Sequence, residues 1–270
     1  MRASIRISVA LLSFALNACK KEDNSEFTDT PVIESYLQPG NVMNVKVSRQ
    51  IPFSGGVNYS SDDINALNVS VTCNNVTYPL TAYGNGQYAD SSLIVAEGAK
   101  YNLSFTYNKK AVAAYTYVPA KPQNYTQSVT TIDITRVDST SGPPSGGFTQ
   151  PDPVELNWTN TDGSYYIVVI ENIESTLDPI RDFGNGTPPG NRFKKKPTNA
   201  SSIEIRAQEF QYYGTHRLIL YHVLPDYASL YDDNSTSSQN LTNPSTAISN
   251  GYGIFTGLNS DTLMIEVREP

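Results

Sequence analysis

The two histidines are the residues of this sequence best suited to acid–base or metal chemistry. His222 lies in an apolar run, 217–224, that has the pattern of a strand, and His216 directly precedes this run. A spacing of six residues places them on one face, but at about 3.3 Å per residue they lie roughly 20 Å apart. They can therefore neither share a metal ion nor act as one base, and we expect each to pack near one end of the strand.

The acidic residues form no recognisable catalytic pattern. Asp232-Asp233-Asn234 lacks the alternating ligands and the distant glutamate of a calcium loop, and Asp62-Asp63 is a weaker candidate. The sequence contains no Gly-x-Ser-x-Gly elbow, His-Glu-x-x-His helix or phosphate-binding glycine loop. Paired carboxylates from distant strands, as in a glycosidase, are the remaining enzymatic alternative. We therefore expect a non-enzymatic protein without cofactor or metal.

Tyrosines and basic residues of the C-terminal half are the best candidates for contacts with a partner. Several tyrosines lie on or near loops, where a ring offers a flat apolar face and a polar tip to a sugar or a protein. Packing at a sheet edge is the alternative role for each ring. The residues that we predict to bind a partner are Arg192, Lys194, Tyr212, Tyr213, Tyr227 and Tyr231.

The elements that must position these side chains are strands, and the sequence predicts an all-β fold. Between residues 42 and 53, Met43, Val45 and Val47 alternate with polar residues, which indicates a strand with one buried face. Gly84-Asn85-Gly86 and Asn108-Lys109 have the composition of hairpin turns. The pattern predicts an immunoglobulin-like β-sandwich over 31–119, with strands at 32–37, 42–53, 67–73, 76–83, 87–95, 100–108 and 110–118.

Residues 119–124 read as a domain boundary, and a second β-sandwich is predicted over 125–270. Trp158, followed by an Asp-Gly turn and a tyrosine-rich strand, resembles a fibronectin-type sandwich with the indole in the core. Asp226 to Tyr231 is the one candidate helical turn. Further strands are expected at 128–137, 154–158, 165–170, 202–206, 217–224, 252–255 and 262–267, and long loops at 139–153, 174–200 and 233–249. Because long loops in compact domains are often functional, we expect this second domain to contact the partner.

The beginning of the chain predicts export and lipid attachment. Arg2 and Arg6 form a positive end, residues 7–16 form a short apolar run, and a small residue precedes Cys19. The apolar run is too short for a membrane-spanning helix, which needs roughly twenty residues. This is the pattern of a cleaved signal, and the cysteine makes 1–18 a lipoprotein signal peptide, because its thiol would carry the diacylglyceryl group. An ordinary signal with an incidental cysteine is the alternative.

Charge and cysteine content narrow the possible partners further. Without the two signal arginines the net charge falls from −7 to −9, which argues against nucleic acid. Residues 19–30 form a lipidated tether, and Lys20 to Asp23 looks like the tag that sends Bacteroidota lipoproteins to the outer face of the outer membrane. Contact with the membrane is then made by the acyl chains. Cys73, the other cysteine, alternates with apolar residues and is expected in the core.

The closing segment of the sequence resembles a known family. Asn243-Pro244 and the run from Ile248 to Phe255 (Ile-Ser-Asn-Gly-Tyr-Gly-Ile-Phe) are similar to the last motif of the Bacteroidota lipoprotein family known as domain of unknown function 4249. Val32 to Leu37, Gly86-Gln-Tyr88 and Gly98 to Leu103 match its opening and middle segments. Genes of this family commonly neighbour TonB-dependent transporters, so the resemblance implies such a barrel as a partner.

These observations together predict a surface-exposed, lipid-anchored outer-membrane protein. We expect it to be an accessory or ligand-capture subunit of a TonB-dependent nutrient-uptake system, with a glycan or peptide as a further ligand. The competing hypothesis is a free-standing glycan-binding or adhesin-type module. Asp138-Ser139-Thr140 and Asp261-Thr262-Leu263 also match a short acceptor motif for O-glycosylation of exported proteins.

Overall fold

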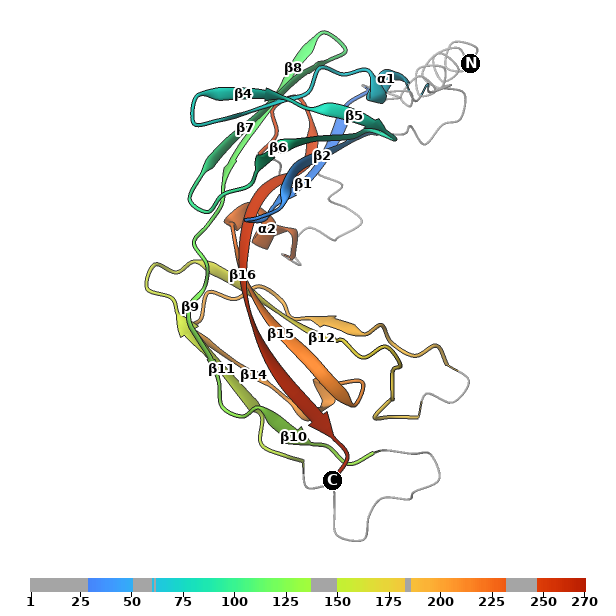
Figure 1. Cartoon of the computed structure of the whole chain (residues 1–270), viewed down its shortest axis with the longest axis vertical. Coiled ribbons are helices and arrows are strands. Elements are labelled where there is room, and N and C mark those ends of the chain that lie inside the picture. Colours follow the sequence, from blue (N-terminus) through green and yellow to red (C-terminus); the bar gives the residue numbers. More distant parts are fainter. Residues whose placement is uncertain (1–28, 51–59, 61, 137–149, 183–185, 232–246) are drawn as a thin grey trace, which may run out of the picture.

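The structure, a computed structural model, describes residues 29–50, 60, 62–136, 150–182, 186–231 and 247–270 (Figure 1). Its described residues form strands and a few short helical turns, which confirms the prediction of an all-β fold. The signal peptide, Cys19, the tether up to residue 28 and the Asp138 motif lie outside the described residues. None of the helices in the described part is long and apolar enough to cross a membrane.

The first half of the chain forms strands that mostly follow one another as hairpins. Its elements are β1 (Pro31–Leu37), β2 (Val42–Arg49), α1 (Asp62–Asn65), β3 (Ser70–Cys73), β4 (Val76–Pro79), β5 (Thr81–Gly84), β6 (Gln87–Ile94), β7 (Lys100–Tyr107) and β8 (Lys110–Tyr117). The predicted turn at Asn108-Lys109 is confirmed: it joins β7 to β8, and both residues have positive φ, 47° and 64°. These angles fit a type I′ hairpin turn, which matches the twist of the flanking strands.

The second half of the chain adds the remaining strands. They are β9 (Gln123–Gln127), β10 (Thr131–Asp133), β11 (Val154–Thr159), β12 (Tyr165–Asn172), β13 (Arg192–Lys194), β14 (Ser202–Ile205), β15 (Gly214–Val223) and β16 (Tyr252–Arg268). The short helical elements are η1 (Ala207–Glu209), α2 (Pro225–Ala228) and η2 (Ser229–Tyr231). The last two confirm the helical turn predicted at 226–231.

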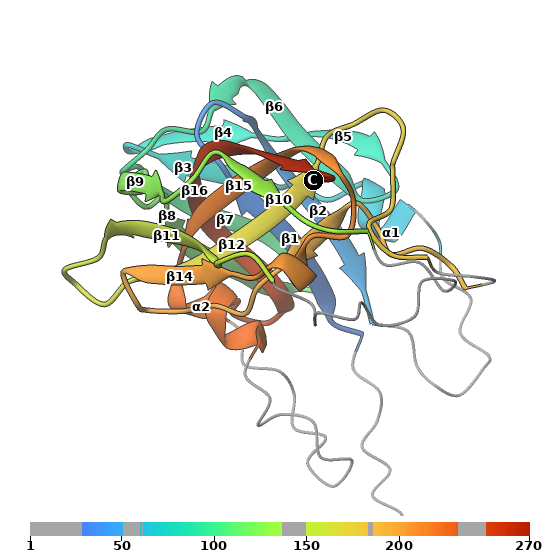
Figure 2. The same cartoon turned by 90° about the horizontal axis from the view of Figure 1, so that it is seen from below.

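Three sheets contain these strands. The largest has the order β13-β12-β15-β16-β1-β2-β6-β5, with β10 also pairing to β16. A four-stranded sheet (β4-β3-β7-β8) and a three-stranded sheet (β14-β11-β9) complete the described part of the fold. The view from below shows β11 and β14 side by side, next to the layer that contains β12 and β15 (Figure 2).

One hydrophobic core lies between the β1–β2–β6 part of the large sheet and the four-stranded sheet. Met43, Val45 and Val47 of β2 are fully buried, as the alternation predicts. Cys73 is also buried there, which confirms its predicted role in packing. The predicted strand 76–83 is wrong in one respect. It is divided at Leu80, which is buried, and its two parts, β4 and β5, pair in different sheets.

A separate core lies between the three-stranded sheet and the β12–β15–β16 part of the large sheet. Trp158 is 4% exposed and packs there, as predicted. The predicted long strand 128–137 is wrong: β9 ends at Gln127, and only 131–133 forms the short strand β10. The assignment of the two units to immunoglobulin and fibronectin types stays a prediction, as does their boundary.

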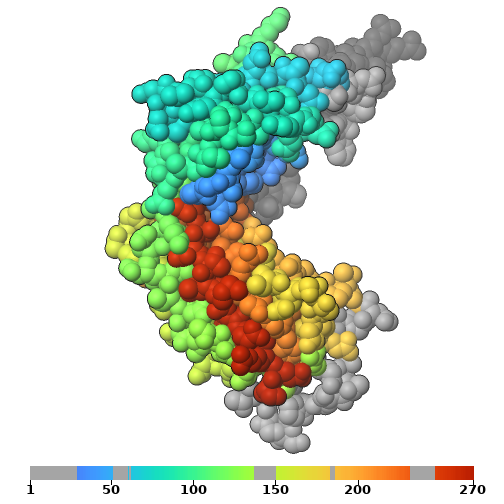
Figure 3. Space-filling view, viewed as in Figure 1, coloured from blue at the N-terminus to red at the C-terminus, as the bar shows by residue number. Residues whose placement is uncertain are grey.

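The two cores share the strand β16. The sequence predicted two short strands, 252–255 and 262–267, but the structure has a single strand of 17 residues. Residues 252–257 pair in parallel with β1, and residues 258–267 pair antiparallel with β15. Figure 1 shows this strand running from one part of the molecule into the other, and the space-filling view shows its lower stretch at the surface (Figure 3). The predicted range 125–270 therefore includes a segment, 248–255, whose Ile248 and Phe255 pack in the first core.

Candidate binding groove

The strand β12 is apolar on both faces, which is unusual for a strand with one face toward solvent. Val168 and Ile170 point into the second core, while Ile167 and Val169 point to the opposite face of the sheet. These two pack with residues from β15 and β16 in a third, smaller cluster. The outer face of the β12–β15–β16 sheet therefore needs a cover of its own.

Tyrosines of β15 and of the short helical segment that follows it, α2 and η2, provide part of that cover. Tyr227 and Tyr231 of α2 and η2 pack against the small cluster, and so does Tyr221 of β15. Beside them lies a groove of about 430 Å³, which we call the cationic groove. It is lined by Tyr36, Gln38, Ile167, Val169, Arg192, Lys194, Tyr221, Val223, Tyr227 and Leu258.

Two exposed basic residues stand on one wall of the cationic groove. Arg192 and Lys194 are two apart on the edge strand β13, so their side chains share a face, while Phe193 points to the other. Lys194 Nζ donates a hydrogen bond to Tyr231 Oη and lies 4.8 Å from the centroid of that ring. Arg192 Nη2 donates to Tyr221 Oη at 3.4 Å. Both cations are thus held by phenols rather than by carboxylates.

The neighbouring Lys195 shows the contrast. Its Nζ pairs with Glu209 at 2.7 Å, and its side chain is largely buried. No ion pair to Asp or Glu joins Arg192 or Lys194 within the part of the chain that the structure describes. The two groove cations therefore keep their charge available to a ligand.

The tyrosines of the groove differ in acidity. Burial raises the pKa of Tyr36, an effect to which Glu34 contributes, and burial together with a contact to Tyr231 raises the pKa of Tyr227. Burial also opposes ionisation of Tyr231, but the hydrogen bonds from Lys194 and Tyr227 lower its pKa overall. The rings of Tyr36 and Tyr227 meet edge to face with centroids 5.9 Å apart. They form an aromatic corner, and Lys194 Nζ lies 6.0 Å from the centroid of the Tyr227 ring.

The structure brings together four of the six residues predicted to bind a partner. Arg192, Lys194 and Tyr227 line the cationic groove, and Tyr231 contacts Lys194 at its rim. Sequence reasoning missed Tyr36, which is 40% exposed at an outward-facing position of β1. The alternation of apolar and polar residues in 32–37 could show that Tyr36 faces outward. It could not show that Tyr36 and β13 line the same groove.

Tyr212 and Tyr213 were predicted wrongly as exposed partner contacts. They are 3% and 7% exposed, so neither ring offers a face to a partner. Tyr213 Oη donates to the carbonyl of Ile134 at 2.7 Å, and Tyr212 Oη donates to the carbonyl of Pro189. Both belong to the internal structure, which is the alternative role of edge packing.

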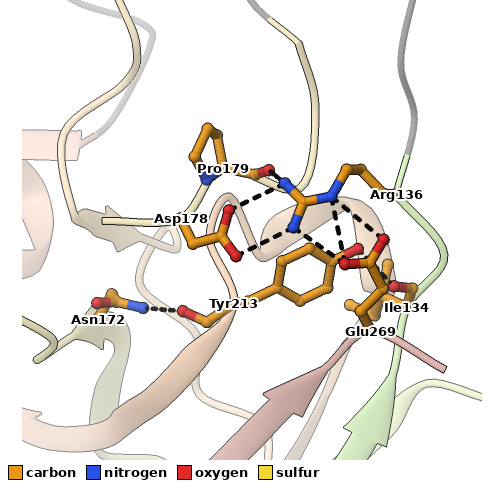
Figure 4. Close-up of polar contacts among 7 residues, drawn as sticks. All are labelled: Ile134, Arg136, Asn172, Asp178, Pro179, Tyr213 and Glu269. Carbon is orange, nitrogen blue, oxygen red and sulfur yellow. Dashed lines mark hydrogen bonds and ion pairs between the residues drawn. The ribbon is translucent and has the colours of Figure 1, made fainter. Parts of the chain in front are cut away.

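A network of ion pairs encloses Tyr213 (Figure 4). The Arg136 guanidinium bonds both oxygens of Asp178, at 2.9 and 3.0 Å, and pairs with Glu269 at 3.0 Å. It lies 4.7 Å from the centroid of the Tyr213 ring and donates to the carbonyl of Pro179 at 2.7 Å. These contacts raise the pKa of Arg136. The network fastens the beginning of the predicted loop 174–200 to the end of the chain.

The described part of 174–200 is consequently not a free loop. It contains β13, and Ile180 is 1% exposed in the second core. Tyr166 also pairs with Thr198, which holds the end of the segment to β12. The other two predicted loops lie mostly outside the described residues, in 137–149 and 232–246.

The histidines lie where the sequence placed them. Both are on β15. His216 is 2% exposed, and burial lowers its pKa. His222 contacts the carbonyl of Ala120 at 2.8 Å.

The acidic candidate Asp62-Asp63 is part of an ion pair, since Asp63 pairs with Arg49 at 2.9 Å. Across the ranges described here, no three His, Cys, Asp or Glu side chains form a group that could hold a metal ion.

Fold and groove together define an all-β protein of packed sheets with a cationic, aromatic groove on the outer face of its largest sheet. The chain belongs to the DUF4249 family, a domain of unknown function, whose family model matches residues 21–263. This match includes every residue that lines the groove. A search of curated proteins finds no match to the chain.

Proposed function

We propose that this protein is a lipid-anchored outer-membrane protein that captures a ligand in the cationic groove and delivers it to a TonB-dependent transporter. The proposal joins three lines of support: the lipoprotein signal ending before Cys19, the membership in the DUF4249 family, and the groove. It assigns the protein a binding role without catalysis.

The observation that carries the proposal is the accessible pairing of cations and aromatic rings over an apolar floor. Arg192 and Lys194 are exposed, and Tyr36 is 40% exposed beside them. A groove of about 430 Å³ falls within the range of small-molecule sites, roughly 300–1,000 Å³. These exposed side chains are not needed for packing of the core, yet they converge on one groove. Such an arrangement is typical of recognition sites.

The path from the lipid to the groove also supports a capture role. Tyr107 Oη donates to Asp29 Oδ2 at 2.8 Å, which fixes the chain just before β1 begins. Tyr36 lies seven residues further along, near the far end of β1, so up to roughly 23 Å of extended chain separate the two points. In the proposed orientation, Asp29 is the membrane-proximal side and the groove faces away from it.

Anchoring and exposure can be tested on cells. A Cys19→Ala variant should no longer fractionate with the outer membrane, since the acyl chains provide the attachment. External protease applied to intact cells should remove the wild-type protein. Protection on intact cells, with cleavage after lysis, would show that the protein does not face the exterior.

The partner can be tested by affinity purification from gently solubilised membranes. We expect a TonB-dependent barrel to co-purify with the wild-type protein and with a Tyr212→Phe control, because Tyr212 is buried away from the groove. Binding to a glycan array without any barrel would favour the free-standing module instead. Deletion of 179–196 is unsuitable for this test, because it would remove Ile180 from the core and the strand β13.

A further inference from the structure

We propose that the ligand of the cationic groove is a small carboxylate with an apolar body. The inference rests on the proposed capture function and specifies its chemistry: the carboxylate binds Arg192 and Lys194, and the apolar part lies on the sheet face between them and Tyr36. Charge, donors, floor and walls of the groove each support one part of this assignment.

The charge of the groove selects an anion. Two of its lining residues are cationic, and none of its lining residues among those described is Asp or Glu. The whole chain carries a net charge of −7, so the groove is a positive site on an acidic protein. Such a local field attracts an anion to the groove while the rest of the surface repels it.

The donors on the two cations suit a carboxylate. Lys194 uses one donor on Tyr231, and Arg192 uses one on Tyr221 at the long distance of 3.4 Å. Both side chains therefore keep donors for a ligand, and the planar guanidinium fork matches the two oxygens of a carboxylate. The phenols hold both side chains over the groove, so less side-chain entropy is lost when a ligand binds.

The floor decides between an apolar body and a sugar. It consists of aliphatic side chains, those of Ile167, Val169, Val223 and Leu258, which cannot satisfy sugar hydroxyls. Gln38, the one amide among the lining residues that the structure describes, already donates through Nε2 to Ser260 Oγ at 3.2 Å. Buried hydroxyls without partners would lose free energy, whereas an aliphatic or aromatic body gains it by leaving water.

The aromatic corner completes the site for such a body. Tyr36 and Tyr227 meet edge to face, at an interplanar angle of 82°. One ring can therefore pack against the face of the ligand while the other packs against its edge. The same rings have hydroxyl tips, which suits a ligand that is apolar at one end and charged at the other.

Calorimetric titration of the lipidated protein in nanodiscs tests the assignment, with empty nanodiscs as the blank. We expect 4-phenylbutyrate to bind, and its neutral amide and acetate to bind about tenfold more weakly or worse, since one lacks the charge and the other the apolar body. Arg192→Gln and Lys194→Gln should each weaken 4-phenylbutyrate about tenfold, and added salt should weaken it further. Lys100→Gln/Arg268→Gln, which removes one Lys and one Arg outside the groove lining, should bind as the wild type does.

The results separate failure of the ligand class from failure of the proposed function. If the wild type binds the acid and the amide with equal affinity, and Tyr227→Ala binds neither, the carboxylate assignment is wrong. Capture of a ligand in the groove would then still stand. Equal binding by the wild type and the two single-charge variants would likewise overturn it. If neither compound binds and a transporter still co-purifies, the carboxylate inference is wrong while the partner proposal stands. If neither a ligand nor a transporter binds, both proposals fail.

Discussion

Replacing Gly257 by alanine should destabilise the joint between the two cores. Gly257 is the residue at which β16 changes partners: it is the last to pair with β1, and Leu258 is the first to pair with β15. An added Cβ would lie 2.0 Å from the carbonyl oxygen of Tyr117 and 2.8 Å from the Cα of Val118. Both contacts are with backbone, so no side-chain rotation can relieve them.

The magnitude follows from the movement that this clash requires. Side-chain carbons essentially never approach closer than 3.0 Å to another heavy atom, so β16 and residues 117–118 must separate by about 1 Å. Overpacking of this kind costs about 1–3 kcal/mol. The shift would also stretch the buried hydrogen bond from Gly257 N to Thr116 Oγ1, now 3.0 Å, at a further cost of about 1 kcal/mol. Together these terms give about 2–4 kcal/mol.

Urea and thermal unfolding provide the assay. The predicted loss corresponds to a decrease in Tm of roughly 4–16 °C, at about 2–4 °C per kcal/mol for a protein of this size. Gly190→Ala is the matched control, because a Cβ there meets no atom within 4 Å. It should change the unfolding free energy by less than about 0.5 kcal/mol. If the two variants unfold at the same urea concentration, β16 does not pass Tyr117 as closely as described.

Three further predictions concern polar side chains with partners inside the second half of the chain. Tyr213→Phe leaves the carbonyl of Ile134 without its 2.7 Å hydrogen bond, so the unfolding free energy should fall by about 1–2 kcal/mol in urea titrations. Because burial lowers the pKa of His216 below 6.5, the unfolded chain takes up this proton first, and stability should decrease as the pH falls through 6.5. His216→Gln should show a smaller decrease between pH 8 and pH 5. The hydrogen bond from Arg136 lowers the pKa of Asp178 below 3.8. The free energy of unfolding of Asp178→Asn should therefore be lower than that of the wild type by up to about 1 kcal/mol at pH 7. This difference should shrink as the pH falls below 3.8, because the wild-type carboxylate then also becomes neutral.

Hairpins were predictable because their determinants are local. The Asn108-Lys109 turn takes positive φ at both central residues, and the strands on either side alternate cleanly between buried and exposed positions. Pairing between distant segments was not predictable in this way. β1 pairs in parallel with residues more than two hundred positions later, and no turn chemistry encodes such a register. The continuity of β16 was missed for the same reason, since its two halves obtain their partners from different parts of the chain.

The candidate site was predictable in composition but only partly in position. Arg192 and Lys194 share a face because they are two apart on a strand, which a loop assignment at 174–200 concealed. Tyr212 and Tyr213 lie three and four residues after the end of η1 and turn inward, where their hydroxyls donate to backbone carbonyls. A tyrosine next to a turn can therefore satisfy its hydroxyl either in water or on a buried carbonyl, and the sequence does not distinguish the two. A prediction that Tyr36 lines the groove would have required knowledge of the β1–β16 pairing.

The joint and the groove depend on the same strand. Tyr36 and Gln38 reach the groove from β1 and the turn after it, while Arg192 reaches it from β13, on the far side of β15, and Tyr227 from α2. The β-strands that carry them are held together by β16, which pairs with β1 through residues 252–257 and with β15 through residues 258–267. Asn259 Nδ2, just beyond Gly257, also bonds the carbonyl of Pro119 at 3.0 Å and Glu97 at 2.9 Å. A change that separates the two cores would widen the groove without touching any of its lining residues. Gly257→Ala should therefore weaken binding of 4-phenylbutyrate, whereas Tyr213→Phe, an equally internal change far from the joint, should destabilise the protein and leave the affinity of the folded state unchanged.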